Sequence, residues 1–391
     1  MIEAFDQLFV LLKHWLVSFV PAALQPLASV VLSIVPILMV FPGLFAFMTI
    51  MERKGLGRIQ NRLGPNRVGP YGLFQPIADG IKSLIKENII PLAADKLLYT
   101  LAPILLLIPA LLAFSVIPYG RNMTPIDIDG GVLFFFAVGA ASEVSIFMAG
   151  WSSHNKYSIL GAMRAIAQMV SYEVPLILSA IPVIMMTGTL STTRIVDLQV
   201  PFYGLLPNWH VFTPWGLAGF FLFVISATAE SNRSPFDLPE GESEIIAGYF
   251  VEYSGFKFAL FFLAEYMGLF AVTGLAITLF LGGWGAPFSF LSFVPSYIWF
   301  FSKFVVFMLF FIWIRGTLPR LRMDQLMNFA WKFMVPMALI NIMVTGLWRF
   351  MTPNIGRWVV SLAILVSAYV LLGRGLAQNS GVGKRVYRYG T

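Results

Sequence analysis

The sequence contains no cysteine, only three histidines and few charged residues for its length. Of its 391 residues, 12% are charged. Without cysteine thiolates, the chain cannot hold a Cys-ligated iron–sulfur cluster or form a disulfide. His14, His154 and His210 lie far apart and lack the spacing of metal ligands. The sequence therefore predicts neither a metal site nor a redox centre on this chain.

Long apolar stretches are abundant instead. Hydrophobic residues make up 58% of the chain, whereas a soluble domain is about half apolar and a quarter charged. A helix needs about 20 apolar residues to cross a bilayer. The sequence predicts an all-α, polytopic membrane protein with a single integral membrane domain (1–391). About nine transmembrane helices are expected at 29–50, 97–118, 132–150, 169–189, 215–230, 257–281, 296–314, 333–350 and 357–374.

Two other segments have a composition suited to the membrane surface. Leu8–Val20 is apolar but short, which fits either a surface segment or a tenth span. It is not expected to be a cleaved signal peptide, because Glu3 and Asp6 lie where such a peptide has basic residues. Apolar residues recur at helical spacing between Leu73 and Ile85. This pattern predicts an amphipathic helix at the interface, serving either as an anchor or as a doorway for a lipid-soluble ligand.

The distribution of basic residues predicts the orientation in the membrane. Most Lys and Arg residues fall in the loops 51–96, 151–168, 231–256 and 315–332 and in the C-terminal tail. Basic loops remain in the cytoplasm, so the N-terminus is expected outside and the C-terminus inside. Because the basic residues follow this topology, the net charge of +7 does not indicate a nucleic-acid partner.

Four carboxylates lie within or at the ends of predicted spans. They are Glu143, Glu173, Glu230 and Glu265. A charge at the bilayer centre costs about 3 kcal/mol even on insertion scales, so such groups usually face a polar interior. Each could pair with a cation, for which Lys303 is available within a span, or reach the membrane surface. Four such residues together favour a proton path.

A second group of acids lies in the stretch "AESNRSPFDLPEGESE". Its acidic residues are Glu230, Asp237, Glu240, Glu242 and Glu244. Asp237 and Glu240 have the spacing of a capping box at a helix start. Capping does not explain the other acids, and Glu240 and Glu244 repel at this helical spacing. Because crowded carboxyls titrate as a group, the stretch is predicted to take up protons from the cytoplasmic side.

Four motifs carry a resemblance to a known family. They are "ERKGLGRIQNRLGPNRVGPYGLFQPIADGIKSLIKE", "GWSSHNKYSILGAMRAIAQMVSYEVPL", "AESNRSPFDLPEGESEIIAGYFVEYSGFKFALFFLAEY" and "RGTLPRLRMDQLMNFAWKFMVP". From about Glu52 to Pro336, the chain resembles the quinone-site membrane subunit of respiratory complex I, the proton-pumping NADH:quinone oxidoreductase. This is the H-type subunit of bacteria, equivalent to mitochondrial subunit 1.

The resemblance implies a role in quinone reduction and proton translocation at a bacterial plasma membrane. Quinone is the expected substrate, with no cofactor on this chain and with FMN and iron–sulfur clusters on partner subunits. Expected partners are two peripheral quinone-site subunits and small membrane subunits that lead to antiporter-like subunits. The residues implied at the quinone site are Glu52, Arg53, Arg62, Asp79, Arg233, Phe236 and Arg320. Those implied in an acidic proton path are Glu143, Glu173, Glu230, Asp237, Glu240, Glu242, Glu244 and Glu265.

Three other functions are considered. An anchor subunit of a related membrane-bound hydrogenase would share the spans and some acids, but the first-loop motif favours quinone. A stand-alone proton-coupled transporter would show inverted repeats and a site at the bilayer midplane. A purely structural anchor would have no use for so many intramembrane acids.

Overall fold

The computed structural model describes residues 5–204, 206–238 and 246–379, and helices dominate it. Eight helical segments among these residues are long and apolar enough to cross a membrane. A shorter apolar helix, α9, corresponds to the predicted span at 215–230. The prediction of an all-α, polytopic membrane protein is confirmed. The long elements are α3 (Gln25–Ile59), α5 (Lys96–Ala113), α6 (Gly131–Ser152), α7 (Lys156–Thr187), α9 (Pro214–Glu230), α11 (Gly255–Phe280), α12 (Ser296–Thr317), α14 (Val335–Phe350) and α15 (Ile355–Asn379).

Local sequence signals set the ends of these helices. The Asn155 side chain accepts a hydrogen bond of 2.9 Å from the Tyr157 N–H and so caps the start of α7. The same helix ends at Gly188, whose φ of +67° suits glycine. Helix α9 starts with Thr213 as its cap and Pro214 in its first turn. Capping satisfies backbone groups that the helix itself leaves unpaired.

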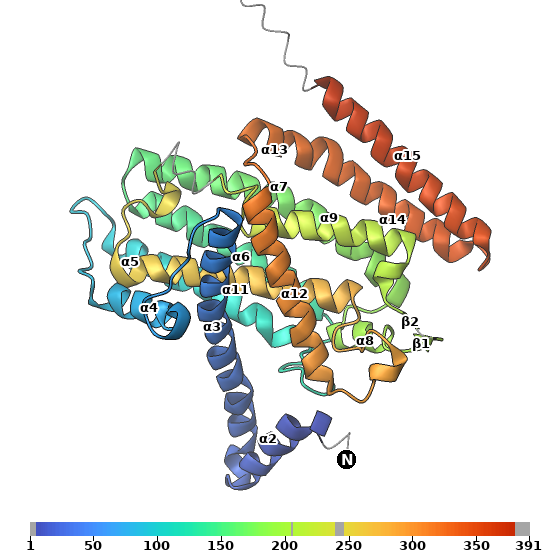
Figure 1. The fold of residues 1–391 in the computed structure, drawn as a ribbon, viewed down its shortest axis with the longest axis horizontal. Coiled ribbons are helices and arrows are strands. Elements are labelled where there is room, and N and C mark those ends of the chain that lie inside the picture. Colours follow the sequence, from blue (N-terminus) through green and yellow to red (C-terminus); the bar gives the residue numbers. More distant parts are fainter. Residues whose placement is uncertain (1–4, 205, 239–245, 380–391) are drawn as a thin grey trace, which may run out of the picture.

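The helices form a bundle around α11. Figure 1 shows α7, α9, α11 and α14 running broadly side by side, with α3 and α12 crossing them steeply. In the most apolar stretch of α11, 72% of the residues are buried. Its Phe270 and Phe280 belong to the main hydrophobic core, together with Phe304 of α12. Helix α11 therefore packs both against helices that run side by side with it and against the crossing helix α12.

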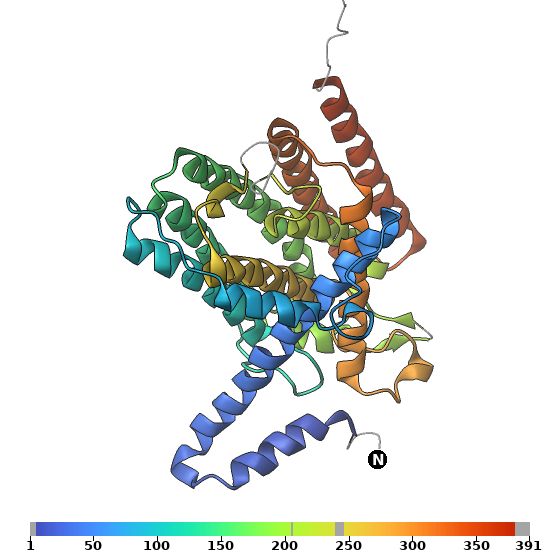
Figure 2. The same cartoon turned by 60° about the vertical axis from the view of Figure 1, so that its left-hand side comes forward.

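Helix α3 projects away from this bundle. Figure 2 shows its N-terminal half extending from the other helices, with α2 (Leu8–Ser18) folded back near its far end. The two are joined through the short turn η1 (Ala22–Leu24). With 11 residues, α2 extends about 16 Å, far less than the hydrocarbon core of about 30 Å. Of the two expectations for this segment, α2 fits the surface segment and is too short to be a tenth span.

The amphipathic helix expected in the first loop is α4 (Gln75–Ile85), which follows the turn η2 (Pro70–Gly72). Its apolar side chains are not buried in the bundle. Ile77, Ile81 and Ile85 are 59%, 52% and 79% exposed. An exposed apolar face on a helix with Lys82 and Asp79 on its other sides suits the surface of a bilayer.

Several helices extend into segments expected as loops, and α3 reaches Ile59 within 51–96. Helix α7 already begins at Lys156, within 151–168. Helix α13 (Met323–Phe329) and a π-helical turn, η7 (Ala330–Met334), occupy much of 315–332 and continue into α14. Charged residues lower the hydropathy there without interrupting the helical backbone. The remaining short elements are η3 (Phe114–Val116), α8 (Thr192–Asp197), the hairpin β1 (Phe202–Tyr203) and β2 (Leu206–Pro207), η4 (His210–Phe212), η5 (Gly248–Phe250) and η6 (Ser289–Leu291).

Candidate functional site

A buried ionic cluster surrounds Glu52 on α3. The Glu52 side chain forms an ion pair with Arg315 of α12 and another, at 3.4 Å, with Arg233 from the loop after α9. It also accepts a hydrogen bond from the Tyr266 hydroxyl of α11. Glu52 is only 5% exposed. A buried carboxylate needs such partners, so this cluster fixes four segments relative to one another.

Arg233 is the central cation of this cluster. Its guanidinium lies 3.8 Å from the centre of the Tyr266 ring. Burial alone lowers the pKa of Arg233, but the neighbouring Tyr266 and Glu52 outweigh that effect and the pKa is raised. Arg233 thus remains charged, and its buried Nε and one terminal nitrogen have no hydrogen-bond partner among the described residues. These N–H groups are fully buried, and Arg233 lines none of the cavities described below.

A cavity of about 430 Å³ lies beside the ionic cluster, between α3, α4 and α11. Its walls include Phe45, Phe258 and Phe262, and its polar lining includes Glu52 and Arg315. The cavity therefore has an apolar body and a charged end. Helix α4 forms one side through Pro76, Asp79, Gly80 and Ser83, and its exposed isoleucines do not line the cavity.

Arg53 and Asp79 also line this cavity. Their side chains form an ion pair of 2.6 Å between α3 and α4, and they are 52% and 39% exposed. Asp79 additionally accepts a hydrogen bond of 3.0 Å from Gln75. This exposed pair ties the surface helix to α3. The sequence-based residues Glu52, Arg53 and Asp79 are thus brought together in one cavity.

The loop after α9 is held by Gln168 of α7. The buried Gln168 amide nitrogen donates to the carbonyls of Ala229 and Phe236, at 2.8 and 2.7 Å, and lies 3.3 Å from the Asn232 side-chain oxygen. These contacts fix the turn that presents Arg233. Sequence reasoning did not identify Gln168, Arg315 or Tyr266. The signal for Gln168 was a polar amide within the motif "AIAQMVSYE".

Phe236, Asp237 and Arg320 lie on the other side of this turn. The Phe236 side chain is buried and packs against Tyr172, with ring centres 5.6 Å apart. Asp237 forms an ion pair of 2.7 Å with Arg320. Burial raises the pKa of Asp237, and Arg320 opposes that rise. None of the three lines the cavity beside Glu52.

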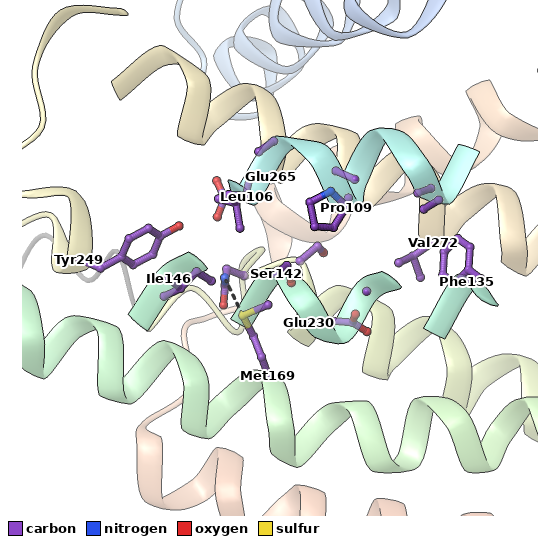
Figure 3. Close-up of a pocket in the computed structure, with 18 residues that line it drawn as sticks. Leu106, Pro109, Phe135, Ser142, Ile146, Met169, Glu230, Tyr249, Glu265 and Val272 are labelled. Carbon is purple, nitrogen blue, oxygen red and sulfur yellow. Dashed lines mark hydrogen bonds between the residues drawn. The ribbon is translucent and has the colours of Figure 1, made fainter. Parts of the chain in front are cut away.

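A second, smaller cavity of about 90 Å³ contains two of the membrane acids. Glu230 of α9 and Glu265 of α11 both line it (Figure 3). In this view Ser142 of α6 lies between them. One carboxylate oxygen of Glu230 is buried without a hydrogen-bond partner among the described residues. The charges of Glu143 and Glu173 act on Glu230, so these three carboxyls are electrostatically coupled.

The remaining sequence-predicted residues lie elsewhere. Arg62 is exposed, donates a hydrogen bond of 2.7 Å to Gln60 and does not line the Glu52 cavity. Glu240, Glu242 and Glu244 fall outside the described residues, so the predicted capping box of Asp237 and Glu240 is described only at Asp237. Within 5–204, 206–238 and 246–379, no group of three or more His, Cys, Asp or Glu side chains has the arrangement of a metal site.

Among the described residues Lys303 forms no ion pair with an acid, so the pairing considered from the sequence is not found there. Its ammonium donates to the backbone carbonyls of Leu281, Gly283 and Gly285, at 2.7, 2.8 and 2.7 Å. It also lies 4.1 Å from the centre of the Trp209 ring. The carbonyls left free where α11 ends attract this cation. Lys303 therefore stabilises the turn after α11.

Comparison with known proteins gives a consistent result. A family model described as NADH dehydrogenase matches residues 32–346. The chain is 48% identical over 328 residues to the H-type subunit of NADH-quinone oxidoreductase from Dehalococcoides mccartyi, which covers 83% of this chain and 89% of the relative. It is 44% identical over 352 residues to the protein of that name from Carboxydothermus hydrogenoformans, covering 89% and 97%. The Brevibacillus brevis relative is 45% identical over 316 residues, covering 81% and 92%.

Proposed function

The chain belongs to the NADH dehydrogenase family that includes the H-type subunit of NADH-quinone oxidoreductase, and from this premise we propose that it is the quinone-site membrane subunit of a proton-translocating NADH:quinone oxidoreductase. Quinone is the substrate in this proposal. Electrons reach it from FMN and iron–sulfur clusters on partner subunits, and the two peripheral quinone-site subunits complete the tunnel. The distribution of Lys and Arg and the bacterial origin of the relatives support a bacterial plasma membrane with the N-terminus outside.

The cavity of about 430 Å³ beside Glu52 carries the proposal. A quinone combines a long apolar tail with a neutral, hydrogen-bonding headgroup. The Phe-lined body suits the tail, and the exposed apolar face of α4 suits entry from the bilayer. Arg53 and Asp79 form the rim, and the Glu52 cluster forms the polar end through which the headgroup passes.

The other proposed quinone-site residues act around this cavity. Arg233 does not line the cavity, and it is proposed to hold the Glu52 carboxylate in place at the polar end. Phe236 and Arg320 hold the loop that carries Arg233, Phe236 through packing and Arg320 through Asp237. Arg62, on the exposed loop after α3, is proposed to contact the peripheral subunits, which together with this chain enclose the headgroup.

We propose that the membrane acids form the start of a proton path. The small cavity lined by Glu230 and Glu265 is mostly apolar but has room for water, and its two carboxylates and Ser142 supply the polar partners that such a water needs. The coupled charges of Glu143, Glu173 and Glu230 allow protonation of one carboxyl to influence the others. Asp237 would connect the quinone end to this group. For Glu240, Glu242 and Glu244 the family resemblance is the support.

The quinone site is tested by filling its cavity. Ala259 lines the cavity from α11, and the adjacent Leu260 does not. We expect Ala259→Trp to raise the quinone KM several-fold in assembled complexes, because the added ring occupies the space of the tail. NADH oxidation with an artificial electron acceptor should be unchanged. Leu260→Trp serves as the matched control.

Equal quinone kinetics in both assembled variants would reject this cavity as the quinone path. Purification of the tagged chain in mild detergent provides an independent test of the enzyme class. NADH-oxidising subunits are expected to co-purify. Nickel–iron subunits in their place would instead establish the hydrogenase anchor.

A further inference from the structure

A third cavity, of about 940 Å³, shares no lining residue with the Glu52 cavity, and the side chain of Phe236 forms part of its wall. Its walls come from α9, α12 and α15, and α13 with the following π turn forms its roof. Two exposed wall residues, Phe221 and Leu318, are 57% and 49% exposed. The cavity is therefore an open groove. We call it the α9–α12–α15 groove.

The two ends of this groove differ chemically. Phe221 of α9, Phe310 of α12 and Leu376 of α15 are apolar wall residues. Arg322 and Lys332 lie at the roof. Phe310 precedes Leu318 by two helical turns, so the apolar wall along α12 is about 12 Å long. The groove thus provides an apolar channel that ends at two cations.

The charge of the roof is positive overall. Asp324 forms an ion pair of 3.3 Å with Arg322, but it neutralises only one of the two cations. Lys332 has no hydrogen-bond or ion-pair partner among the described residues and lies in the π turn Ala330–Met334. Such turns are rare and occur frequently at functional sites. The exposed amides of Gln325 and Asn328 add hydrogen-bond donors beside the cations.

We propose that the α9–α12–α15 groove binds an anionic phospholipid, with an acyl chain along the apolar wall and the phosphate at Arg322 and Lys332. Basic pockets between transmembrane helices are suited to anionic headgroups. A free phosphate would contact the roof and leave the apolar wall uncovered. A quinone is uncharged and would leave the cations uncompensated. A phospholipid satisfies both ends of the groove.

Photolabelling of the whole, detergent-purified complex tests this proposal. The probe is phosphatidylglycerol with a photoreactive group in one acyl chain, and a phosphatidylcholine probe of the same chain is the zwitterionic comparison. We expect the anionic probe to label peptides of α9, α12 and α15. The double variant Arg322→Gln with Lys332→Gln should lower this labelling on the order of tenfold or more, because each cation near a membrane surface contributes to the binding of anionic lipid.

The matched control removes two exposed cations elsewhere. Lys96→Gln with Lys156→Gln changes the total charge equally, and neither residue lines the groove. This control should keep the labelling of the groove. Equal labelling in the Arg322/Lys332 variant and the wild type would overturn the proposal, as would equal labelling by the zwitterionic probe. Labelling of the groove by a photoreactive quinone in preference to the lipid, or of another subunit covering it, would also overturn it.

Discussion

Replacing Glu52 by glutamine should be among the most damaging single changes in this chain. Glu52 is the carboxylate that the Arg233 and Arg315 side chains share. The change keeps the size of the side chain and removes its charge. Two guanidinium groups then lie close together without the negative charge between them, and Arg233 cannot move into water because its side chain is only 12% exposed.

The expected magnitude follows from burial. Removing one partner of a buried ion pair costs about 3 to 5 kcal/mol, because the other charge stays buried and unpaired. Arg315→Gln should cost less, about 1.5 kcal/mol, since Glu52 retains Arg233 and the partner lost was 37% exposed. Asp79→Asn breaks an exposed pair with Arg53 and should cost at most about 1 kcal/mol.

The assay is the loss of this subunit from the assembled complex on heating. Native gels of membranes held at increasing temperatures give the temperature at which half of the complexes have lost the subunit. We expect this temperature to fall in the order wild type, Asp79→Asn, Arg315→Gln, Glu52→Gln. Electron transfer from NADH to an artificial acceptor counts the complexes in each sample. If Glu52→Gln proved as heat-resistant as Asp79→Asn, the argument from burial would be refuted.

Three other changes have defined outcomes. Gln168→Leu removes its hydrogen bonds to the Ala229 and Phe236 carbonyls, each of which keeps a backbone partner, at about 0.5 to 1.5 kcal/mol per bond. It should lower heat resistance and raise the quinone KM more than it lowers kcat, and an unchanged KM would contradict the role of Gln168 in positioning the loop. Lys303→Met removes three hydrogen bonds and should lower heat resistance more than Lys13→Met, which removes one. The folded protein holds the Asp237 proton more tightly than the unfolded chain, so the free energy of unfolding falls as pH rises from 3.8 through the raised pKa. Arg320→Gln should raise this pKa further and extend the loss of heat resistance to higher pH, and identical pH profiles for variant and wild type would oppose this.

The sequence was sufficient to predict the helices within the membrane because apolar length alone specifies them. It failed where a helix leaves the apolar region. The helix α3 continues through the charged segment that follows residue 50, and α7 starts well before residue 169. Hydropathy falls at such points, but the backbone hydrogen bonds of a helix do not depend on side-chain polarity. Helix ends were therefore predicted less well than helix positions.

The site was only partly predictable for a different reason. Glu52 and Asp79 could be proposed from motifs in one loop. The partners of Glu52 lie 181 residues away at Arg233 and 263 residues away at Arg315. Lys303 illustrates the same limit, because its partners are backbone carbonyls, which every residue has. Pairings of this kind depend on the crossing of α3 and α12 over the bundle, which local patterns do not reveal.

The low burial of the apolar stretch of α3 has a consequence for biogenesis. Its most apolar stretch exceeds those of the other long helices in hydropathy, yet only 11% of its residues are buried. Such a helix can enter the bilayer on its own as soon as it leaves the ribosome, since it needs no other helix to cover polar groups. The later α11 is less apolar, contains Glu265 and is 72% buried. Its stable insertion therefore depends on earlier helices already present in the membrane, and α3 acts as an early anchor for the nascent chain.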